Sequence, residues 1–136
     1  MRLLMVYCDT FSYEPAVVNL DGAEEKAESA TISKTLVGFI HVEAADEENS
    51  AAVETKLIKN LKWAARKNET QNIVLHSFAH LSESKADPQF TKALLNRAEE
   101  RLQKSGYETH QTPFGYFLHL NVQAPGHSFS RLFKEF

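Results

Sequence analysis

Two imidazoles, an aromatic ring and two hydroxyl groups lie within seven residues, in the segment His76–Ser82 with the sequence HSFAHLS. Imidazole exchanges protons near pH 7 more readily than other side chains, and it is a common metal ligand. His76 and His80 are four residues apart, a spacing that places two ligands on one face of a helix. The apolar run Ile73–Leu75 directly precedes them and is typical of a buried strand. The pair is therefore predicted at a strand end and its exit turn, where the helical argument fails.

Support for a metal site or a cofactor is weak throughout the sequence. The chain has no cysteine pair, no HExxH motif and no Gly-rich nucleotide-binding loop. The single cysteine, Cys8, ends an apolar run, where a thiol is usually an inert small hydrophobe. Ser77 lacks the GxSxG context of a nucleophilic serine. We predict no metal and no cofactor, and a metal-dependent hydrolase built from His41, His76 and His80 is the least favoured alternative.

A pocket between two strand ends is the remaining place for chemistry. The segment Ser77–Ser82 leaves one predicted strand, and Thr112–Leu120, with the sequence TPFGYFLHL, enters another. Aromatic side chains on turns beside a glycine can stack on a base or a ribose, while free backbone groups bind polar atoms. The alternative is that these aromatic side chains fill the core, and composition alone favours it. The aromatic residues concerned are Phe78, Phe114, Tyr116 and Phe117.

The hydrophobic pattern predicts the elements that would position these segments. One helix covers about Ser50–Lys67 with Ser50 as its candidate N-cap, and a second begins at Asp87-Pro88 and stops at Gly106. The polar segment Asp21–Lys34 is predicted as a loop. The predicted strands are Leu3–Cys8, a second strand with Phe11 and Tyr13, Leu36–Val42, Ile73–His76, Tyr107–Gln111 and, last, Tyr116–Val122. Because each long helix connects two strands, we expect one compact α/β domain over residues 1–136, a mixed β-sheet packed with two main helices.

Composition sets limits on the partners. The chain has 136 residues, of which 43% are hydrophobic and 24% charged, as in ordinary globular proteins. No apolar stretch approaches the roughly 18 residues that span a bilayer, so we expect no membrane contact and a cytoplasmic location. The formal net charge is −3, and no cluster of Lys and Arg stands out along the sequence. A nucleic-acid partner would therefore make a small or local contact, or be held with the help of another protein.

Fragments spread over the chain point to a known family. They are MRLLMVYCD at the start, VGFIHVEAADEEN, FAHLS, LNRAEERLQKSGY, TPFGY, and PGH followed by SRLF. In these fragments the sequence resembles the N-terminal editing domain of archaeal-type threonyl-tRNA synthetases. The resemblance implies the fold of D-aminoacyl-tRNA deacylases and one function, the hydrolysis of serine wrongly esterified to threonine tRNA. Such double-sieve editing clears an error that the synthetic site cannot reject, because serine is smaller than threonine by only one methyl group.

The resemblance also implies where the substrate binds. In this family the pocket holds the 3′-terminal adenosine and its aminoacyl group, and the substrate's own 2′-hydroxyl assists the attacking water. His80 is the implied catalytic or positioning residue, Val42 matches a position on the adenine side, and His127 matches a histidine without an assigned role. The residues implied to bind substrate are Val42, Ser77, Phe78, Ala79, Phe114, Gly115, Tyr116 and Phe117.

Several positions of this pocket depart from the family pattern. After the PFGY motif the family continues with an aromatic residue, often tyrosine, and a lysine that helps catalysis, whereas this chain has Phe117 and Leu118. A family glutamate near the C-terminal end is matched by Arg131. Two imidazoles are gained, at His41 and His76. A rewired site that uses one of them is a hypothesis, because imidazole can orient water or stabilise an oxyanion near pH 7.

Two functions of different classes remain. The first is an aminoacyl-tRNA deacylase that binds the 3′-end of aminoacyl-tRNA and hydrolyses the ester of mischarged tRNA, foremost seryl-tRNA(Thr). The second is a catalytically degenerate paralogue that binds aminoacyl-tRNA, an aminoacyl-nucleotide or a synthetase without turnover, and the missing lysine and tyrosine support it. The resemblance implies a homodimer. No synthetic or anticodon-binding domain follows the matching region, so we expect a freestanding protein, recruited by the CCA end itself or by a threonyl-tRNA synthetase.

Overall fold

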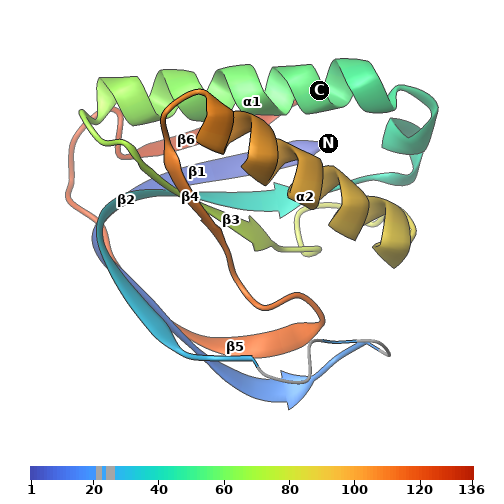
Figure 1. Cartoon of the computed structure of the whole chain (residues 1–136), viewed down its shortest axis with the longest axis horizontal. Coiled ribbons are helices and arrows are strands. Elements are labelled where there is room, and N and C mark those ends of the chain that lie inside the picture. Colours follow the sequence, from blue (N-terminus) through green and yellow to red (C-terminus); the bar gives the residue numbers. More distant parts are fainter. Residues whose placement is uncertain (21–22, 24–26) are drawn as a thin grey trace.

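A six-stranded mixed sheet with two helices on one face forms the protein in a computed structural model, which describes residues 1–20, 23 and 27–136. The strands run in the order β4-β3-β2-β1-β5, and β6 also pairs with β1 (Figure 1). The elements are β1 (Arg2–Val18), β2 (Ala30–His41), the short 3₁₀ helix η1 (Ala44–Glu48), α1 (Ser50–Lys67), β3 (Asn72–Ser77), α2 (Pro88–Lys104), β4 (Glu108–Gln111), β5 (Tyr116–Gln123) and β6 (Arg131–Glu135). The predicted α/β class with two main helices is confirmed.

The prediction of two separate strands at the N-terminus is wrong. β1 is one strand of 17 residues, and its pairing with β2 continues from Arg2 to Tyr13. On its other side β1 pairs with β6 along its first part and with β5 along its second part. The apolar run and the alternating run of the sequence are thus two parts of one strand, because the pairing with β2 passes over only Asp9 and resumes at Thr10.

Two further boundaries differ from the prediction. β2 begins at Ala30, inside the segment Asp21–Lys34 that was predicted as loop; Asp21, Gly22 and residues 24–26 lie outside the described residues. The strand β6 follows the expected last strand and was not predicted. Its five residues form a strand because they pair with β1 over Arg2–Val6, a contact that is remote in the sequence. Short polar strands of this kind carry little local signal.

The helix ends follow local chemistry. The Asp87 carboxylate accepts a hydrogen bond from the Gln89 N–H at 2.8 Å, and Pro88 occupies the first helical position, as predicted for α2. Gly106 lies just after α2 with φ +92°, a conformation that glycine adopts without strain. In α1 the cap position belongs to Asn49 rather than Ser50, and neither side chain caps the helix.

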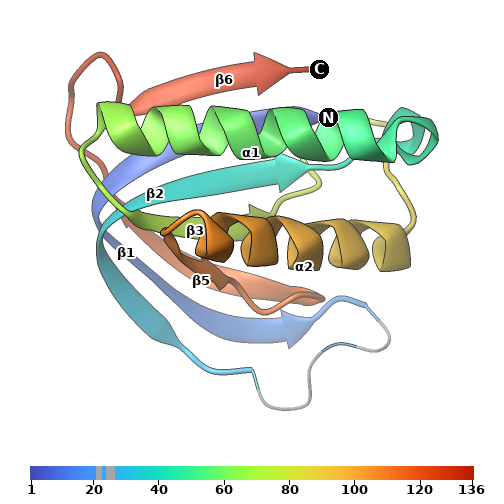
Figure 2. The ribbon, with the colours of Figure 1, turned by 45° about the horizontal axis from the view of Figure 1, so that its top comes forward.

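Both helices pack on the same face of the sheet, as Figure 2 shows. Their buried apolar residues lie against the inner face of β1, β2 and β3, and full burial of one such leucine contributes about 1.5–3 kcal/mol. The fully buried side chains here include Leu57, Leu61, Leu94, Leu95 and Leu102. No helix within the described ranges is long and apolar enough to cross a membrane.

Candidate functional site

A cavity of about 360 Å³ lies where β2 and β3 end and α2 begins. β2, β3 and β4 are parallel, and ligands of such sheets bind beyond the carboxyl ends of the strands. The cavity also reaches the turn before β5. Its described lining residues are Asn19, Leu20, Val42, His76, Ser77, Phe78, Ala79, His80, Lys85, Ala86, Pro88, Thr91, Pro113, Phe114, Gly115, Tyr116, Phe117, Leu118 and Leu120.

The geometry brings together the residues implied to bind substrate. All eight, from Val42 to Phe117, line the cavity, and so do His80 and His76. The fragments FAHLS and TPFGYF, some 30 residues apart in sequence, face one another across it. His41 and His127 are not among the described lining residues.

The first wall of the cavity is the segment 77–86, called here the clamped wall. Its chain leaves β3 with the Phe78 N–H donating to the Ile40 carbonyl at 2.9 Å. The Phe78 ring packs edge-on against Phe39 at 5.3 Å and against His80 at 4.9 Å between centroids. At the far end the Ala86 N–H donates to the Val42 carbonyl. Phe78 therefore joins the core and lines the cavity, so the two interpretations of this aromatic residue both hold.

His76 is a buried residue at the floor of the cavity. Its side chain is 6% exposed, and its Nδ1 lies 2.8 Å from the Thr112 hydroxyl oxygen. Burial, and then the nearby imidazole of His80, lower the pKa of His76 to about 4. The ring is therefore neutral at pH 7. It can orient a polar group, but it does not supply the cation that an oxyanion needs.

The second wall is the turn 113–118, called here the turn wall. Gly115 has φ +86°, and a Cβ at this position would lie 2.9 Å from the Ala23 Cβ. Its carbonyl accepts hydrogen bonds from the N–H groups of Asn19 and Leu20. The turn thus requires glycine for two reasons, a left-handed backbone and a close neighbour. Phe117 follows it, lines the cavity and is 48% exposed.

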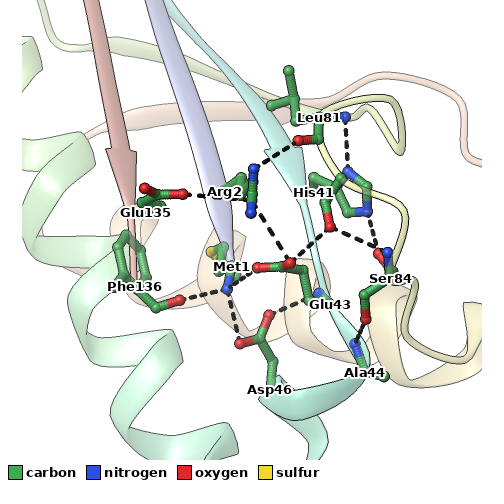
Figure 3. Close-up of polar contacts among 11 residues, drawn as sticks. Met1, Arg2, His41, Glu43, Ala44, Asp46, Leu81, Ser84, Glu135 and Phe136 are labelled. Atoms are coloured by element: carbon green, nitrogen blue, oxygen red, sulfur yellow. Dashed lines mark hydrogen bonds and ion pairs between the residues drawn. The ribbon is translucent and has the colours of Figure 1, made fainter.

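His41 is placed as a clamp rather than as a reactive group. It is fully buried, its Nδ1 accepts a hydrogen bond from the Leu81 N–H at 2.9 Å, and its Nε2 lies 2.7 Å from the Ser84 carbonyl oxygen (Figure 3). An accepting Nδ1 leaves the proton on Nε2, which donates to Ser84. Both ring nitrogens are thereby engaged by the backbone of the clamped wall. This arrangement supports a positioning role for His41.

A charged cluster beside His41 ties the same wall to both chain ends (Figure 3). The Met1 ammonium lies 2.9 Å from Glu43 Oε1 and 2.9 Å from Asp46 Oδ1, and it donates to the Phe136 carbonyl. Glu43 accepts a hydrogen bond from the Ser82 hydroxyl at 2.8 Å. Burial alone would raise the pKa of Glu43, but the ammonium, the Ser82 hydroxyl and the guanidinium of Arg2 hold it below its usual value.

Arg2 completes this cluster. Its guanidinium donates to the Leu81 carbonyl at 3.2 Å and lies within 4 Å of the carboxylates of Glu43 and Glu135. Leu81 is the neighbour of His80 in the chain, so the residue after the candidate catalytic group is held on both its N–H and its carbonyl. No local sequence pattern indicates this cluster, because its members come from segments that are far apart along the chain.

The charges at the cavity restrict its chemistry. Within the described part of the lining no carboxylate is present, and the titratable side chains are His76, His80, Lys85 and Tyr116. Lys85 was missed by the sequence analysis, and only its place just before the start of α2 could have suggested it. Leu118, at the position of the family's lysine, contributes an apolar surface. His119 lies on the other face of β5, as strand alternation requires.

Neither a metal centre nor a reactive thiol appears in the described residues. No group of three or more His, Cys, Asp or Glu side chains is arranged to hold a metal ion within the ranges 1–20, 23 and 27–136. Burial, and then the charge of Asp9, raise the pKa of Cys8 to about 11, so the thiol stays protonated and inert. Arg131 donates to the Pro125 carbonyl and is not among the described residues that line the cavity.

Comparison with known proteins identifies the family. A family model described as the archaea-specific editing domain of threonyl-tRNA synthetase matches residues 1–136. The chain belongs to this family. The family predicted from the sequence fragments is thereby confirmed.

Curated relatives agree with this family assignment. The threonine–tRNA ligase of Thermococcus kodakarensis is 31% identical over 135 residues, which cover 97% of this chain and 22% of the ligase. The ligase of Methanobrevibacter smithii is 32% identical over 136 residues, and that of Methanopyrus kandleri is 32% identical over 133 residues. These matches cover 97% of this chain, with 22% and 21% of the two ligases. The chain thus spans about a fifth of the length of the curated relatives it matches.

A solved structure shows the same fold. The structure titled c-Myc DNA Unwinding Element Binding Protein matches with a TM-score of 0.69 and 13% sequence identity, covering 99% of this chain and 98% of that chain. At this identity the likeness concerns the fold alone. It agrees with the predicted fold class, an α/β unit with a mixed β-sheet and two main helices.

Proposed function

We propose that this editing domain hydrolyses the ester bond of mischarged tRNA, foremost seryl-tRNA(Thr), with His80 as its catalytic or positioning residue. The observation that carries the proposal is the cavity itself, which places His80 beside Phe78, Ala79 and the turn wall. Its volume of about 360 Å³ lies in the range of small-ligand sites, about 300–1,000 Å³. Val42 and the aromatic residues of the turn wall supply apolar surface for the terminal adenosine.

The lack of a carboxylate among the described lining residues supports a mechanism that relies on the substrate. In ester hydrolysis water adds to the carbonyl carbon, the tetrahedral intermediate collapses, and the bond to the 3′-oxygen of the ribose breaks. That oxygen takes up a proton as it leaves. With no acidic side chain among the described lining residues, the 2′-hydroxyl of the substrate is the group that orients the water and relays the proton. His80 holds these groups in line, and such positioning lowers the barrier by removing orientational freedom.

Serine is separated from threonine by size. One methyl group in a tight site changes the barrier by about 1–3 kcal/mol, which corresponds to a factor of about 10–200 in rate. The wall of Phe78 and Ala79 is held by the Ile40 carbonyl and by ring packing against Phe39. A wall fixed in this way can exclude an extra methyl group, whereas a mobile one would yield to it.

The deciding experiment is deacylation of Ser-tRNA(Thr), Thr-tRNA(Thr) and a D-aminoacyl-tRNA by the wild type and by His80→Ala. We expect fast loss of serine only, and a fall of at least about 100-fold in kcat for the variant, in line with the loss of an acid–base or positioning group. His110→Ala is the matched control, because His110 is exposed on β4 and does not line the cavity. A tRNA ending in 2′-deoxyadenosine tests the role of the 2′-hydroxyl. Equal rates for His80→Ala and the wild type would refute the role of His80.

Leu118 favours the second candidate function, a binding module without turnover. Its apolar side chain lines the cavity at the position where the family has a lysine that helps catalysis. Folded protein that binds aminoacyl-tRNA but turns over none of the three esters would establish this alternative. Leu118→Lys then tests whether the lost cation is the reason, with a gain of turnover as the expected result.

The remaining partners follow from the same proposal. The 3′-end of aminoacyl-tRNA is the ligand of the cavity, and a threonyl-tRNA synthetase supplies the mischarged substrate. We place the protein in the cytoplasm, where charged tRNA is used in translation. The homodimer implied by the resemblance stays a prediction, and sedimentation of the purified protein tests it.

A further inference from the structure

The outward side of α1 gathers cationic side chains. The helix carries five of them against a single carboxylate, Glu54, for a net charge of +4. Glu54 is buried and is held by Arg97 at 2.7 Å and by Arg101 at 2.9 Å, both on α2, so it does not reach the outward surface. The five cations, exposed or half-exposed, are Lys56, Lys59, Lys62, Arg66 and Lys67; they are called here the basic face.

The distribution of charge over the molecule is uneven. α2 adds four cations and two carboxylates, a net +2, so the two helices together carry +6. Because the whole chain carries −3, everything outside the helices carries −9. An exposed helix usually alternates acids and bases four residues apart, which stabilises it by about 0.2–0.5 kcal/mol per pair. The basic face has no such acid, and helix stability therefore does not account for it.

The basic face is unneutralised in the structure. Among the described residues, the side chains of Lys56, Lys59, Lys62 and Arg66 form no ion pair and no hydrogen bond. These cations are not clustered along the sequence, because two or three uncharged residues separate most of them. The helical repeat of 3.6 residues brings them to one side.

An aromatic pair lies within the same surface. Trp63 is 38% exposed and packs edge-on against Phe129, which is 37% exposed, at 5.9 Å between centroids. The Lys67 ammonium lies 5.7 Å from the Trp63 ring and 5.4 Å from the Phe129 ring. Lys59, Trp63 and Lys67 follow one another at intervals of four residues, so they form one row on α1. Cations alternating with an exposed aromatic ring suit a polyanion with planar or sugar surfaces.

We propose that the basic face is the docking surface for the phosphate backbone of an RNA duplex, the acceptor stem of the tRNA whose 3′-end enters the cavity. This inference rests on the proposed function. The basic face belongs to the helix layer that also contains α2 (Figure 2), and the first turn of α2, with Pro88 and Thr91, lines the cavity. Charge complementarity selects RNA as the occupant, since a duplex offers regularly spaced phosphates to a straight row of cations.

The first test uses Trp63, the only tryptophan of the chain, as an intrinsic probe. Its fluorescence is followed while an RNA hairpin with an acceptor-stem sequence and a CCA end is added, at about 50 and about 200 mM salt. The test variant is Lys59→Gln/Arg66→Gln. The matched control is Asn121→Glu/Gln123→Glu, on exposed positions of β5 at the opposite end of the molecule (Figure 1), and it lowers the net charge by the same two units.

We expect the test variant to bind the hairpin about tenfold more weakly at the lower salt concentration, and the slope of log Kd against log salt to fall by about 2, near 0.9 for each lost phosphate contact. The control should bind within about twofold of the wild type. The proposal is overturned if Trp63 fluorescence does not respond to RNA. It is also overturned if both variants weaken binding equally, because net charge alone would then be responsible.

A second measurement separates this proposal from the proposed function. The wild type and the test variant are compared on seryl-tRNA and on a seryl ester of adenosine, which lacks the stem. Docking on α1 predicts a lower kcat/KM for the variant on seryl-tRNA only, and an equal loss on both esters contradicts it. Failure of the wild type to hydrolyse either ester refutes the editing function, while the hairpin titration still decides whether RNA docks on the basic face.

Discussion

The clamped wall, residues 77–86, is held by side chains from remote parts of the chain, whereas the turn wall, residues 113–118, is held by backbone hydrogen bonds between Gly115 and the segment just after β1. On the clamped wall, His41 and Arg2 bind both backbone groups of Leu81, and Glu43 binds Ser82. On the turn wall, Gly115 takes a left-handed conformation and its carbonyl receives two N–H groups. One wall is therefore fixed by a buried charge network and the other by a single residue, and each should fail in its own way.

The difference matters for editing. The clamped wall carries Phe78, Ala79 and His80, which must keep their place if one methyl group is to be excluded. The turn wall exposes Phe117, and we expect its ring to adapt to the adenosine. A rigid wall beside the aminoacyl group and an adaptable wall beside the nucleotide agree with the proposed function, because size discrimination requires the former.

The largest expected effect comes from removing the central acid of the charged cluster. Asp46→Ala leaves the buried Met1 ammonium with Glu43 as its only carboxylate and removes the acceptor of the Glu43 N–H. We expect a loss of about 4 kcal/mol in the free energy of unfolding, measured by chemical denaturation, because the buried ammonium loses one of its two partner carboxylates and breaking a buried ion pair costs about 3–5 kcal/mol. Glu135→Gln is the control, and its exposed carboxylate should matter by less than about 1 kcal/mol. Equal losses in both variants would show that burial of the cluster has no energetic role.

The next largest effect is a pH dependence of the folding stability that buried His76 contributes and exposed histidines do not. The pKa of His76 is about 4 in the folded protein, against an ordinary value of 6.5 that applies to the unfolded chain. Between these two pH values the unfolded chain therefore binds more protons than the folded protein. The stability contributed by neutral His76 is complete above pH 6.5 and is lost as the pH falls toward 4, in total about 3 kcal/mol. The wild type should therefore lose about 3 kcal/mol more than His76→Asn between pH 7 and pH 4. The exposed His110→Asn serves as control, and parallel curves for the wild type and His76→Asn would contradict a neutral buried ring.

A smaller effect tests the turn wall. Gly115→Ala forces a non-glycine residue to φ +86° and brings its Cβ to 2.9 Å from the Ala23 Cβ, so we expect a loss of about 2 kcal/mol in thermal unfolding. Gly126→Ala is the control, because no atom lies within 4 Å of a Cβ there, and it should change stability by less than about 0.5 kcal/mol. If Gly115→Ala leaves the thermal stability unchanged, the turn wall adapts more easily than its geometry indicates.

The smallest effect on stability is expected at Phe117. Because the ring is 48% exposed, Phe117→Ala should cost less than about 1 kcal/mol while KM for the aminoacyl-tRNA rises about tenfold, as for loss of one base-stacking ring. The measurement is a kcat and KM pair together with a melting curve. Unchanged KM would remove this ring from the binding surface and leave the turn wall with a purely structural role.

Local chemistry accounts for what the sequence predicted correctly. The start of α2 at Asp87-Pro88, its stop before Gly106 and the span of α1 depend on neighbours in the chain, and so they can be read without the fold. The fragments FAHLS and PFGY indicated the family because their residue types and order are specific. These same fragments then supplied both walls of the cavity.

The tertiary structure alone decided how those fragments are held. The strand β6 forms because it pairs with the first part of β1. His41 holds the clamped wall because Leu81 and Ser84 form hydrogen bonds with its two ring nitrogens. Lys85 lines the cavity next to Ala86, whose N–H donates to the Val42 carbonyl. The cations of α1 did not stand out as a cluster along the sequence, and the net charge of its outward side depends on Glu54 being turned inward to Arg97 and Arg101. Contacts between residues some 40 positions apart leave no local pattern, since they depend on how the whole sheet curls and packs.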